Sequence, residues 1–314
     1  MSQSPISDRV ADIVAKTLHA YNVRHAFGVP GGEVVTLIDA LQKAGIAFHL
    51  ARHETSAAIM AAGASTMTTH PELLVTTVGP GLANAVNGIA DALQERVPLV
   101  VISGVVDRAT RARYTHQVID HAALLRPVVK ATFEIEAESA ASTVARALAI
   151  AMTEPMGPVH LDLSPAVAAA SGMESSIPEP AKQFAVPASA EDPAVRYLLE
   201  RIHAADRPLI VVGLDAARDH AGPSIEYLAE AIGAPVVTTY KAKGVIPESH
   251  PLALGSAGLS PLADRVLLPL VQEADLVLLI GYDPIEMRLG WLDFVVDPTK
   301  LVDISKVPPD HGMH

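Results

Sequence analysis

One acidic residue stands at the head of an otherwise small and apolar segment. Glu54 begins the run Glu54–Gly63, in which alanines dominate together with Ile59 and Met60. A carboxyl group that is removed from water keeps its proton to higher pH, so it can hand that proton to a ligand. This chemistry suits an acid that protonates a heterocyclic nitrogen. The alternative is an ordinary acidic residue at a helix N-terminus, where the helix dipole favours negative charge. Glu54 alone does not separate the two interpretations.

Two glycine-containing turns each follow a segment that we expect to be a strand. The first holds Pro30 and Gly31 within Phe27–Gly32, and the second is Gly79-Pro80-Gly81, which leads into Asn84. Glycine lets a backbone turn sharply and approach a ligand closely, and open α/β sheets bind ligands at the carboxyl ends of their strands. Either turn alone is explained by simple chain reversal. Neither matches the GxGxxG pattern of dinucleotide-binding proteins, which gives hydride transfer little support.

A third polar segment is His116-Gln117, and Lys130 follows it after an apolar stretch. Ordinary surface exposure would explain each of these residues. The order of all the segments along the chain is more specific than any one of them.

Together these segments resemble the pyrimidine-binding (PYR) domain of thiamine diphosphate-dependent 2-oxo acid enzymes, the acetolactate synthase and pyruvate decarboxylase group. The later segments Arg207–Gly213, Lys243–Pro247 and Ala274–Gly281 look like the central domain of that group, and Gly281–Glu286 is similar to its acetolactate synthase turn. The resemblance runs from about Asp8 to Lys306. The segments that carry it in the first half are Gly28–Gly31, Arg52–Glu54, Gly79–Asn84, Ala90–Ala92, His116-Gln117 with Lys130, and Gly157–Asp162.

The resemblance implies catalytic roles for three residues. Glu54 would donate a proton to the aminopyrimidine ring of thiamine diphosphate, and Gln117 with His116 would face the substrate or the thiazolium. The walls of the cofactor pocket would be Pro30, Gly31, Gly79, Pro80 and Asn84. The cofactor would then supply the electron sink, and the protein the orientation and a dry pocket.

The sequence departs from the family pattern at two points. His116-Gln117-Val118 replaces the Phe-Gln-Glu of many acetolactate synthases, so the substrate pocket lacks a carboxylate. In addition, the family holds Mg²⁺ and the diphosphate through a Gly-Asp-Gly motif that ends in Asn, since a hard cation needs oxygen ligands. No Gly-Asp dipeptide occurs in the 314 residues, so we expect no metal ligand in this chain.

We therefore expect one subunit of a split enzyme, whose partner chain carries the diphosphate domain with its Mg²⁺ and completes a hetero-oligomer. The expected reaction decarboxylates a small 2-oxo acid and transfers the acyl carbanion equivalent, as acetolactate synthases do. The alternative is a non-catalytic regulatory or scaffolding relative, or a fragment of a longer enzyme. FAD is possible in the central domain, as in some acetolactate synthases, but nothing in Arg207–Ile304 requires it.

Alternation of strands and helices must position these residues. Short β-branched runs alternate with alanine-rich segments, which is typical of parallel sheets covered on both faces. We expect an α/β protein with a PYR domain at 1–170, a proline-containing linker at 171–194 and a Rossmann-like central domain at 195–314. Strands are expected at 25–27, 48–52, 73–78, 99–103, 159–163, 209–213, 236–240, 276–281 and 301–304, and helices in the first half at 8–21, 33–44, 54–66, 82–95 and 139–153.

Composition excludes several classes of partner. Half of the residues are apolar, which suffices for two buried cores, and the net charge of -12 without a basic run argues against nucleic acid or an anionic membrane. Cysteine is absent, so thiolate metal sites and disulfides are excluded. The N-terminus lacks the order of a signal peptide and no apolar run could span a bilayer, so we expect a soluble, cytoplasmic protein.

Overall fold

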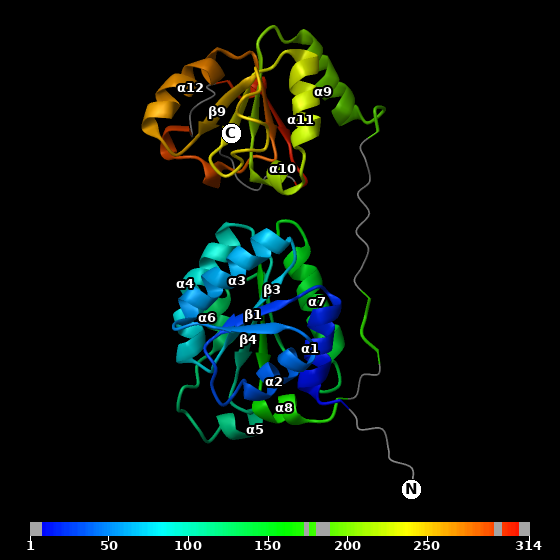
Figure 1. Ribbon diagram of the computed structural model, residues 1–314, viewed down its shortest axis with the longest axis vertical. Coiled ribbons are helices and arrows are strands. Elements are labelled where there is room, and N and C mark those ends of the chain that lie inside the picture. Colours follow the sequence, from blue (N-terminus) through cyan, green and yellow to red (C-terminus); the bar gives the residue numbers. More distant parts are fainter. Residues whose placement is uncertain (1–7, 173–175, 180–188, 292–296, 308–314) are drawn as a thin grey trace. The chain divides into compact units, whose positions relative to one another are not determined.

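The computed structural model describes residues 8–172, 176–179, 189–291 and 297–307. Contacts divide the chain into two compact units, Met1–Gln183 and Phe184–His314, each built on a parallel sheet (Figure 1). The predicted fold class, two parallel-sheet α/β domains with flanking helices, is confirmed. Among the described helices, none has both the length and the apolar character needed to cross a lipid bilayer.

The first unit holds a six-stranded sheet in the order β2-β1-β3-β4-β6-β5, with every neighbouring pair parallel. The central strands β3 and β4 are buried along their whole length, as strands covered on both faces must be. The six strands are β1 (His25–Gly28), β2 (Ala47–Leu50), β3 (Glu72–Thr76), β4 (Leu99–Gly104), β5 (Ala131–Glu134) and β6 (Pro158–Leu163).

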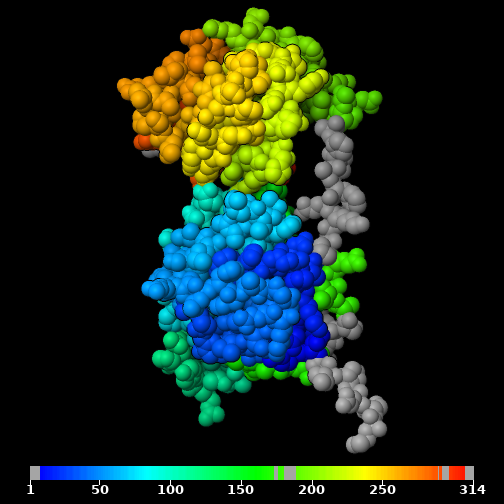
Figure 2. Space-filling model, viewed as in Figure 1, coloured from blue at the N-terminus to red at the C-terminus, as the bar shows by residue number. Residues whose placement is uncertain are grey.

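Helices cover both faces of this sheet (Figure 1). One face carries α1 (Val10–Ala20), α2 (Val35–Lys43), α7 (Ala140–Met152) and α8 (Pro165–Ala169), and the other carries α3 (Glu54–Thr68), α4 (Pro80–Gln94) and α6 (His121–Leu125). The short α5 (Arg108–Arg111) lies in the connection after β4. In Figure 2 most of the near face of this unit is formed by the early part of the chain, drawn in blue.

Small residues bring α3 and α4 unusually close together. A Cβ atom added at Gly88 of α4 would lie 2.6 Å from the Cβ of Ala58 and 3.1 Å from the carbonyl oxygen of Thr55, both on α3. Ala58 and Ala61 are completely buried. The first turns of α3 therefore pack against the middle of α4.

The second unit has a five-stranded parallel sheet in the order β11-β10-β7-β8-β9. The chain leaves β7 toward one edge and later returns on its other side, which is the strand order of a Rossmann-like sheet. The elements are α9 (Pro193–Ala204), β7 (Pro208–Val212), α10 (Leu214–Arg218), α11 (Gly222–Ile232), β8 (Val236–Thr239), β9 (Ala253–Ala257), α12 (Pro261–Glu273), β10 (Leu276–Ile280) and β11 (Leu301–Ile304), with 3₁₀ turns at Pro284–Glu286, Leu289–Trp291 and Pro298–Lys300.

A buried carboxylate joins the carboxyl ends of three of these strands. Glu286 is 1% exposed, and it accepts hydrogen bonds from the backbone N–H groups of Leu214 and Asp283 and from the hydroxyl of Thr239. Burial raises the pKa of Glu286 to about 7, against the opposing effect of these donors.

Some elements differ from the sequence predictions. Strands β5 and β9 are edge strands that we did not predict, since Ala131–Glu134 and Ala253–Ala257 are only partly buried and lack an apolar run. Helix α4 begins at Pro80, two residues earlier than predicted, because proline is well suited to the first helical position.

The segment predicted as a linker, 171–194, falls in part on residues 173–175 and 180–188, which lie outside the described residues. Its two described ends have regular contacts. Ser171 pairs with Arg9 next to α1, and Pro193 opens α9 with Asp192 as N-cap. The contact boundary between the units falls after Gln183.

Candidate active site

The predicted cofactor residues meet at the carboxyl edge of the first sheet. Gly31 follows β1, Glu54 follows β2 and Gly79 follows β3, and these are three adjacent strands. The chain leaves β1 toward β2 on one side and later places β3 on the other side, so this is a topological switch point. Such points are where open α/β sheets form ligand crevices.

Glu54 is the first residue of α3 and only 8% exposed. The ring of His53 caps the helix by accepting from the backbone N–H of Thr55 at 3.2 Å. The side-chain amide of Asn84 donates to Oε2 of Glu54 at 3.1 Å. Thr55 returns a hydrogen bond from its hydroxyl to the carbonyl oxygen of Asn84. The starts of α3 and α4 are thus joined in both directions.

The second carboxylate oxygen faces a space that is kept open by glycine. Among the described residues, Oε1 of Glu54 has no hydrogen-bond partner, and a Cβ atom at Gly81 would lie 3.5 Å from it. The same Cβ would lie 2.2 Å from the hydroxyl oxygen of Thr77, so any larger residue at position 81 would force the side chain of Thr77 to move. A ligand group that approaches Oε1 therefore meets an acceptor or acid whose other oxygen is already held.

Two features require glycine at position 79, namely its backbone conformation and the close approach of Gln117. Its φ of +57° lies in the left-handed region, and an added Cβ would stand 2.1 Å from the carbonyl oxygen of Gln117. The backbone of Gln117, itself at a φ of +60°, thus packs directly against the turn before α4. The connection after β4 reaches the same edge of the sheet.

The remaining predicted site residues lie on the surface. Pro30, Pro80, His116 and Gln117 are exposed, and Gly31 is half-buried against Thr77. The ring of His116 contacts that of Tyr114 edge-on, with centroids 6.0 Å apart. Within the described chain, no hydrogen bond links the side chain of His116 or Gln117 to Glu54. The structure therefore brings Glu54, Asn84 and the glycine turns together, whereas the catalytic roles of His116 and Gln117 stay predictions.

Lys130 has a structural role. Its ammonium group donates to the carbonyl oxygens of Ile150 and Thr153 at the end of α7, at 2.6 and 2.5 Å. Partial burial lowers the pKa of Lys130 below its ordinary value. Lys130 therefore caps a helix C-terminus, which explains a lysine beside apolar residues.

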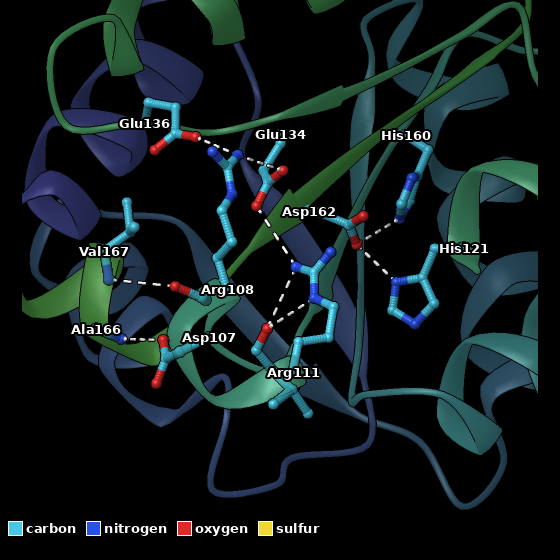
Figure 3. A network of polar contacts seen from close by, with 12 residues as sticks. Asp107, Arg108, Arg111, His121, Glu134, Glu136, His160, Asp162, Ala166 and Val167 are labelled. Atoms are coloured by element: carbon cyan, nitrogen blue, oxygen red, sulfur yellow. Dashed lines mark hydrogen bonds and ion pairs between the residues drawn. The ribbon is translucent and has the colours of Figure 1, made fainter. Parts of the chain in front are cut away.

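Sequence reasoning missed a buried polar cluster next to the Gly79 turn (Figure 3). Nδ1 of His121 lies 2.6 Å from Oδ1 of Asp162, and Nε2 of His160 lies 3.6 Å from the same oxygen and 3.0 Å from the hydroxyl of Ser103. Nε2 of His121 faces the backbone N–H of Gly79 at 3.1 Å. The alternation His160-Leu161-Asp162 on a predicted strand puts two polar side chains on one face, and that signal could have pointed to the cluster.

His160 is completely buried, and this burial lowers its pKa to about 4, so its ring is neutral near pH 7. A cavity of ≈ 540 Å³ opens beside the cluster, lined by His121, Asp162, Arg111 and Phe133 among others. The guanidinium group of Arg111 donates to the carbonyl oxygen of Val106. It also pairs with the carboxylate of Glu134 (Figure 3).

Comparison with known proteins connects both units to one kind of protein. Residues 8–124 match the description "Thiamine pyrophosphate enzyme, N-terminal TPP binding domain", and residues 195–312 match "Thiamine pyrophosphate enzyme, central domain". Thiamine pyrophosphate is another name for thiamine diphosphate.

Acetolactate synthases are among the similar curated proteins. The chain is 32% identical over 286 residues to acetolactate synthase of Bacillus subtilis (strain 168), covering 90% of this chain and 50% of that protein. It is 30% identical over 297 residues to the large subunit of acetolactate synthase isozyme 1 of Escherichia coli (strain K12), covering 94% of this chain and 52% of that protein. The chain thus spans about half the length of the curated relatives it matches.

A solved structure shares the fold. The thiamine diphosphate-dependent 4-hydroxybenzoylformate decarboxylase of Rhodococcus jostii RHA1 superposes with a TM-score of 0.78 at 23% identity. The match covers 96% of this chain and 55% of that chain. At this identity the likeness concerns the arrangement of helices and strands.

Proposed function

This chain belongs to the thiamine pyrophosphate enzyme family, and from that premise we propose that it supplies the pyrimidine-binding half of a thiamine diphosphate site with Glu54 as its acid. The observation that carries the proposal is the geometry of Glu54. Its carboxyl group is buried at the switch point, held by Asn84 through one oxygen and open toward Gly81 through the other. A merely helix-stabilising acid needs neither burial nor a dedicated amide donor.

The residues of this chain have separate tasks in the proposed site. A protonated Glu54 donates from Oε1 to a ring nitrogen, and Asn84 keeps the carboxyl group in the orientation for that donation. Gly31, Gly79 and Gly81 leave room for a flat ring near the backbone. When bound, thiamine diphosphate supplies the electron sink for decarboxylating a 2-oxo acid and transferring the acyl carbanion equivalent. His116 and Gln117 offer donors at the exposed side, where a substrate carboxylate can enter.

The diphosphate and its metal need ligands from elsewhere. The 314 residues contain no Gly-Asp dipeptide, so the family's motif for Mg²⁺ is not among them. We place Mg²⁺ and the diphosphate on a separate subunit that completes the site as a hetero-oligomer. Relatives that are described as large subunits, such as the one from Escherichia coli, are consistent with assembly from more than one kind of chain. A cytoplasmic location belongs to the same proposal.

The proposed reaction does not require flavin. At the carboxyl edge of the second sheet, the buried Glu286 accepts the backbone N–H of Leu214 and the hydroxyl of Thr239. The absorbance of the purified protein tests for flavin, because a flavoprotein is yellow and a protein without flavin is colourless.

The test of Glu54 uses the complex of this chain with a co-expressed chain that carries the Gly-Asp-Gly motif. Isothermal titration with thiamine diphosphate at millimolar Mg²⁺ should show binding, and carbon dioxide release from pyruvate and other 2-oxo acids should show turnover. Glu54→Gln should lower turnover by about 10²–10⁴-fold, the usual contribution of a general acid. Glutamine keeps the shape but cannot exchange a proton, and Glu54→Asp is one methylene short.

Glu138→Gln is the matched control, because Glu138 is an exposed acid outside the site. Assembly of all variants, measured by light scattering, should be unchanged. If the complex binds no thiamine diphosphate, or if Glu54→Gln turns over like the wild type, the proposal is wrong. The second outcome would favour the alternative of a non-catalytic regulatory or scaffolding relative. If the chain supports turnover only when it is part of one longer polypeptide, the alternative of a fragment of a longer enzyme would be favoured.

A further inference from the structure

His121 connects the Gly79 turn to the sheet through two hydrogen bonds. It is the first residue of α6 and 3% exposed. One ring nitrogen, Nδ1, lies 2.6 Å from Oδ1 of Asp162 on β6, and the other, Nε2, lies 3.1 Å from the backbone nitrogen of Gly79. Figure 3 shows the ring of His121 directed at Asp162.

Only one protonation state of His121 satisfies both contacts. A backbone N–H can only donate, so Nε2 must present its lone pair to Gly79. A neutral imidazole carries a single proton, which then has to be on Nδ1, where it is donated to the carboxylate of Asp162. A doubly protonated ring would place two donors against each other at Gly79. The surroundings therefore fix the tautomer.

This tautomer argues against a metal ion in the cluster. His121, His160 and Asp162 bring three potential ligand atoms within 4.8 Å of one another, which resembles the set of a catalytic zinc. To bind a metal through Nδ1, however, His121 would have to move its proton to Nε2, against the N–H of Gly79. The 2.6 Å contact is also shorter than the ~3.3 Å between two ligands of a tetrahedral ion at about 2.0–2.1 Å.

The bond to Gly79 has no substitute in the described chain. Gly79 is buried, and among the described residues no backbone carbonyl accepts its N–H. An N–H group left without an acceptor in this place would cost free energy comparable to a lost hydrogen bond. Gly79 is the N-cap of α4, and Asn84 stands on the first turns of that helix. The position of Asn84, and through it that of Glu54, depends on this turn.

We propose that His121, fixed as the Nδ1–H tautomer by Asp162, is a positioning residue that holds the Gly79 turn and the start of α4 in place for Glu54. The cluster is a hydrogen-bond relay from β6 to α4 and not a metal site. The purpose of the relay, though not its existence, rests on the proposed function. The relay itself can be measured without any cofactor.

The first experiment determines the tautomer by NMR on the full chain labelled with ¹⁵N-histidine. We expect long-range ¹H–¹⁵N spectra to show His121 with a protonated Nδ1 and an unprotonated Nε2 at neutral pH. Added Zn²⁺ should leave both signals in place. A protonated Nε2, or a shift of the His121 and His160 signals on adding zinc, would overturn the proposal.

The second experiment measures hydrogen exchange of the Gly79 amide. His121→Phe keeps the apolar bulk of the ring but removes the acceptor, so exchange should become at least about tenfold faster, as expected for one hydrogen bond. His121→Gln can place its side-chain oxygen near the position of Nε2, and it should retain most of the protection. His203→Gln, at an exposed histidine on α9, is the control and should change nothing.

Unchanged exchange in His121→Phe would contradict the relay, and so would loss of protection in the control. If His121→Phe does not fold, His121→Gln and the tautomer measurement still decide the question. In the assembled complex, His121→Phe should weaken thiamine diphosphate binding about tenfold. If Glu54→Gln has no effect on turnover while the tautomer and exchange results hold, the proposed function fails and the relay stands.

Discussion

At the scale of single residues, Asn84 is the neighbour on which Glu54 depends. Its amide donates to one oxygen of the buried carboxyl group, and its carbonyl oxygen accepts the hydroxyl of Thr55. A carboxylate in a buried position is costly unless donors surround it. Removing the amide of Asn84 therefore takes away a hydrogen bond that stabilises the buried carboxyl group of Glu54. A substitution elsewhere on the exposed surface of α4 would leave this hydrogen bond in place.

Asn84→Ala should lower the free energy of unfolding by about 1 kcal/mol relative to Asn87→Ala, the net worth of a typical hydrogen bond. Asn87 is exposed and lies one turn further along α4, so it carries the same change in helix propensity. Urea unfolding followed by circular dichroism would measure both variants. Equal stability of the two would show that the amide of Asn84 contributes nothing to holding Glu54.

A local signal marked Glu54, because this carboxylate stands directly before a run of small residues. Its proposed role came from the order of the segments in the family resemblance and not from that signal alone. His121 could not be predicted in this way, because its two partners, Gly79 and Asp162, are 42 and 41 residues away in the sequence. The position of Lys130 beside apolar residues was visible in the sequence, but its role was not. In the structure its ammonium group caps the C-terminus of α7.

At the scale of elements, the packing of α3 on α4 decides where the acid and its amide meet. Gly88 allows this approach, since a Cβ there would stand 2.6 Å from that of Ala58. Gly63 on α3 is also helical, but a Cβ at that position meets nothing within 4 Å. The two glycines therefore offer a matched pair.

Gly88→Ala should destabilise the protein by about 1–2 kcal/mol, because overpacking costs about 1–3 kcal/mol and improved helix propensity returns up to ~1. Gly63→Ala should instead stabilise it by about 0.5–1 kcal/mol. Thermal or urea unfolding would give the two signs. Adding Ala58→Gly to Gly88→Ala should yield a favourable coupling of about 1 kcal/mol in a double-mutant cycle. Stabilisation by Gly88→Ala would show that the helices can move apart freely.

Elements with a strong periodic signal were predictable, and weak edge strands were not. The buried strands β3, β4, β7 and β10 could be predicted because each is a nearly continuous apolar segment of the sequence. Strand β9, Ala-Leu-Gly-Ser-Ala, has no such run, and it forms because the edge of β8 offers unpaired backbone groups. Tertiary context thus overrides local propensity at the edges of both sheets.

At the scale of the whole molecule, each unit contains a buried group whose pKa is displaced within the range from about pH 4 to pH 7, and the two displacements have opposite effects. His160 in the first unit is held neutral, with its pKa lowered from 6.5 to about 4. Between these values the unfolded chain binds more protons, so the first unit loses stability as the pH falls through this window. Glu286 in the second unit has its pKa raised from 4.5 to about 7. Here the folded state binds more protons, so the second unit loses stability as the pH rises through that window.

Differential scanning calorimetry should therefore show two transitions that move in opposite directions between about pH 5 and 6.5, and the change in unfolding free energy of each unit over this window should be at most ~2 kcal/mol. His160→Leu should flatten the pH dependence of the first unit, and Glu286→Gln that of the second. Transitions that shift together with pH, or slopes that persist in these variants, would contradict the assignment.

The mutual bonds between the starts of α3 and α4 have a consequence for how a ligand would associate. Because Glu54 and Asn84 are immobilised by protein contacts alone, the entropic cost of ordering them falls on folding and not on association. An incoming ring would meet side chains that are already ordered. Complex formation should therefore resemble the docking of rigid bodies at this wall, and the heat of binding should come mainly from the new contacts.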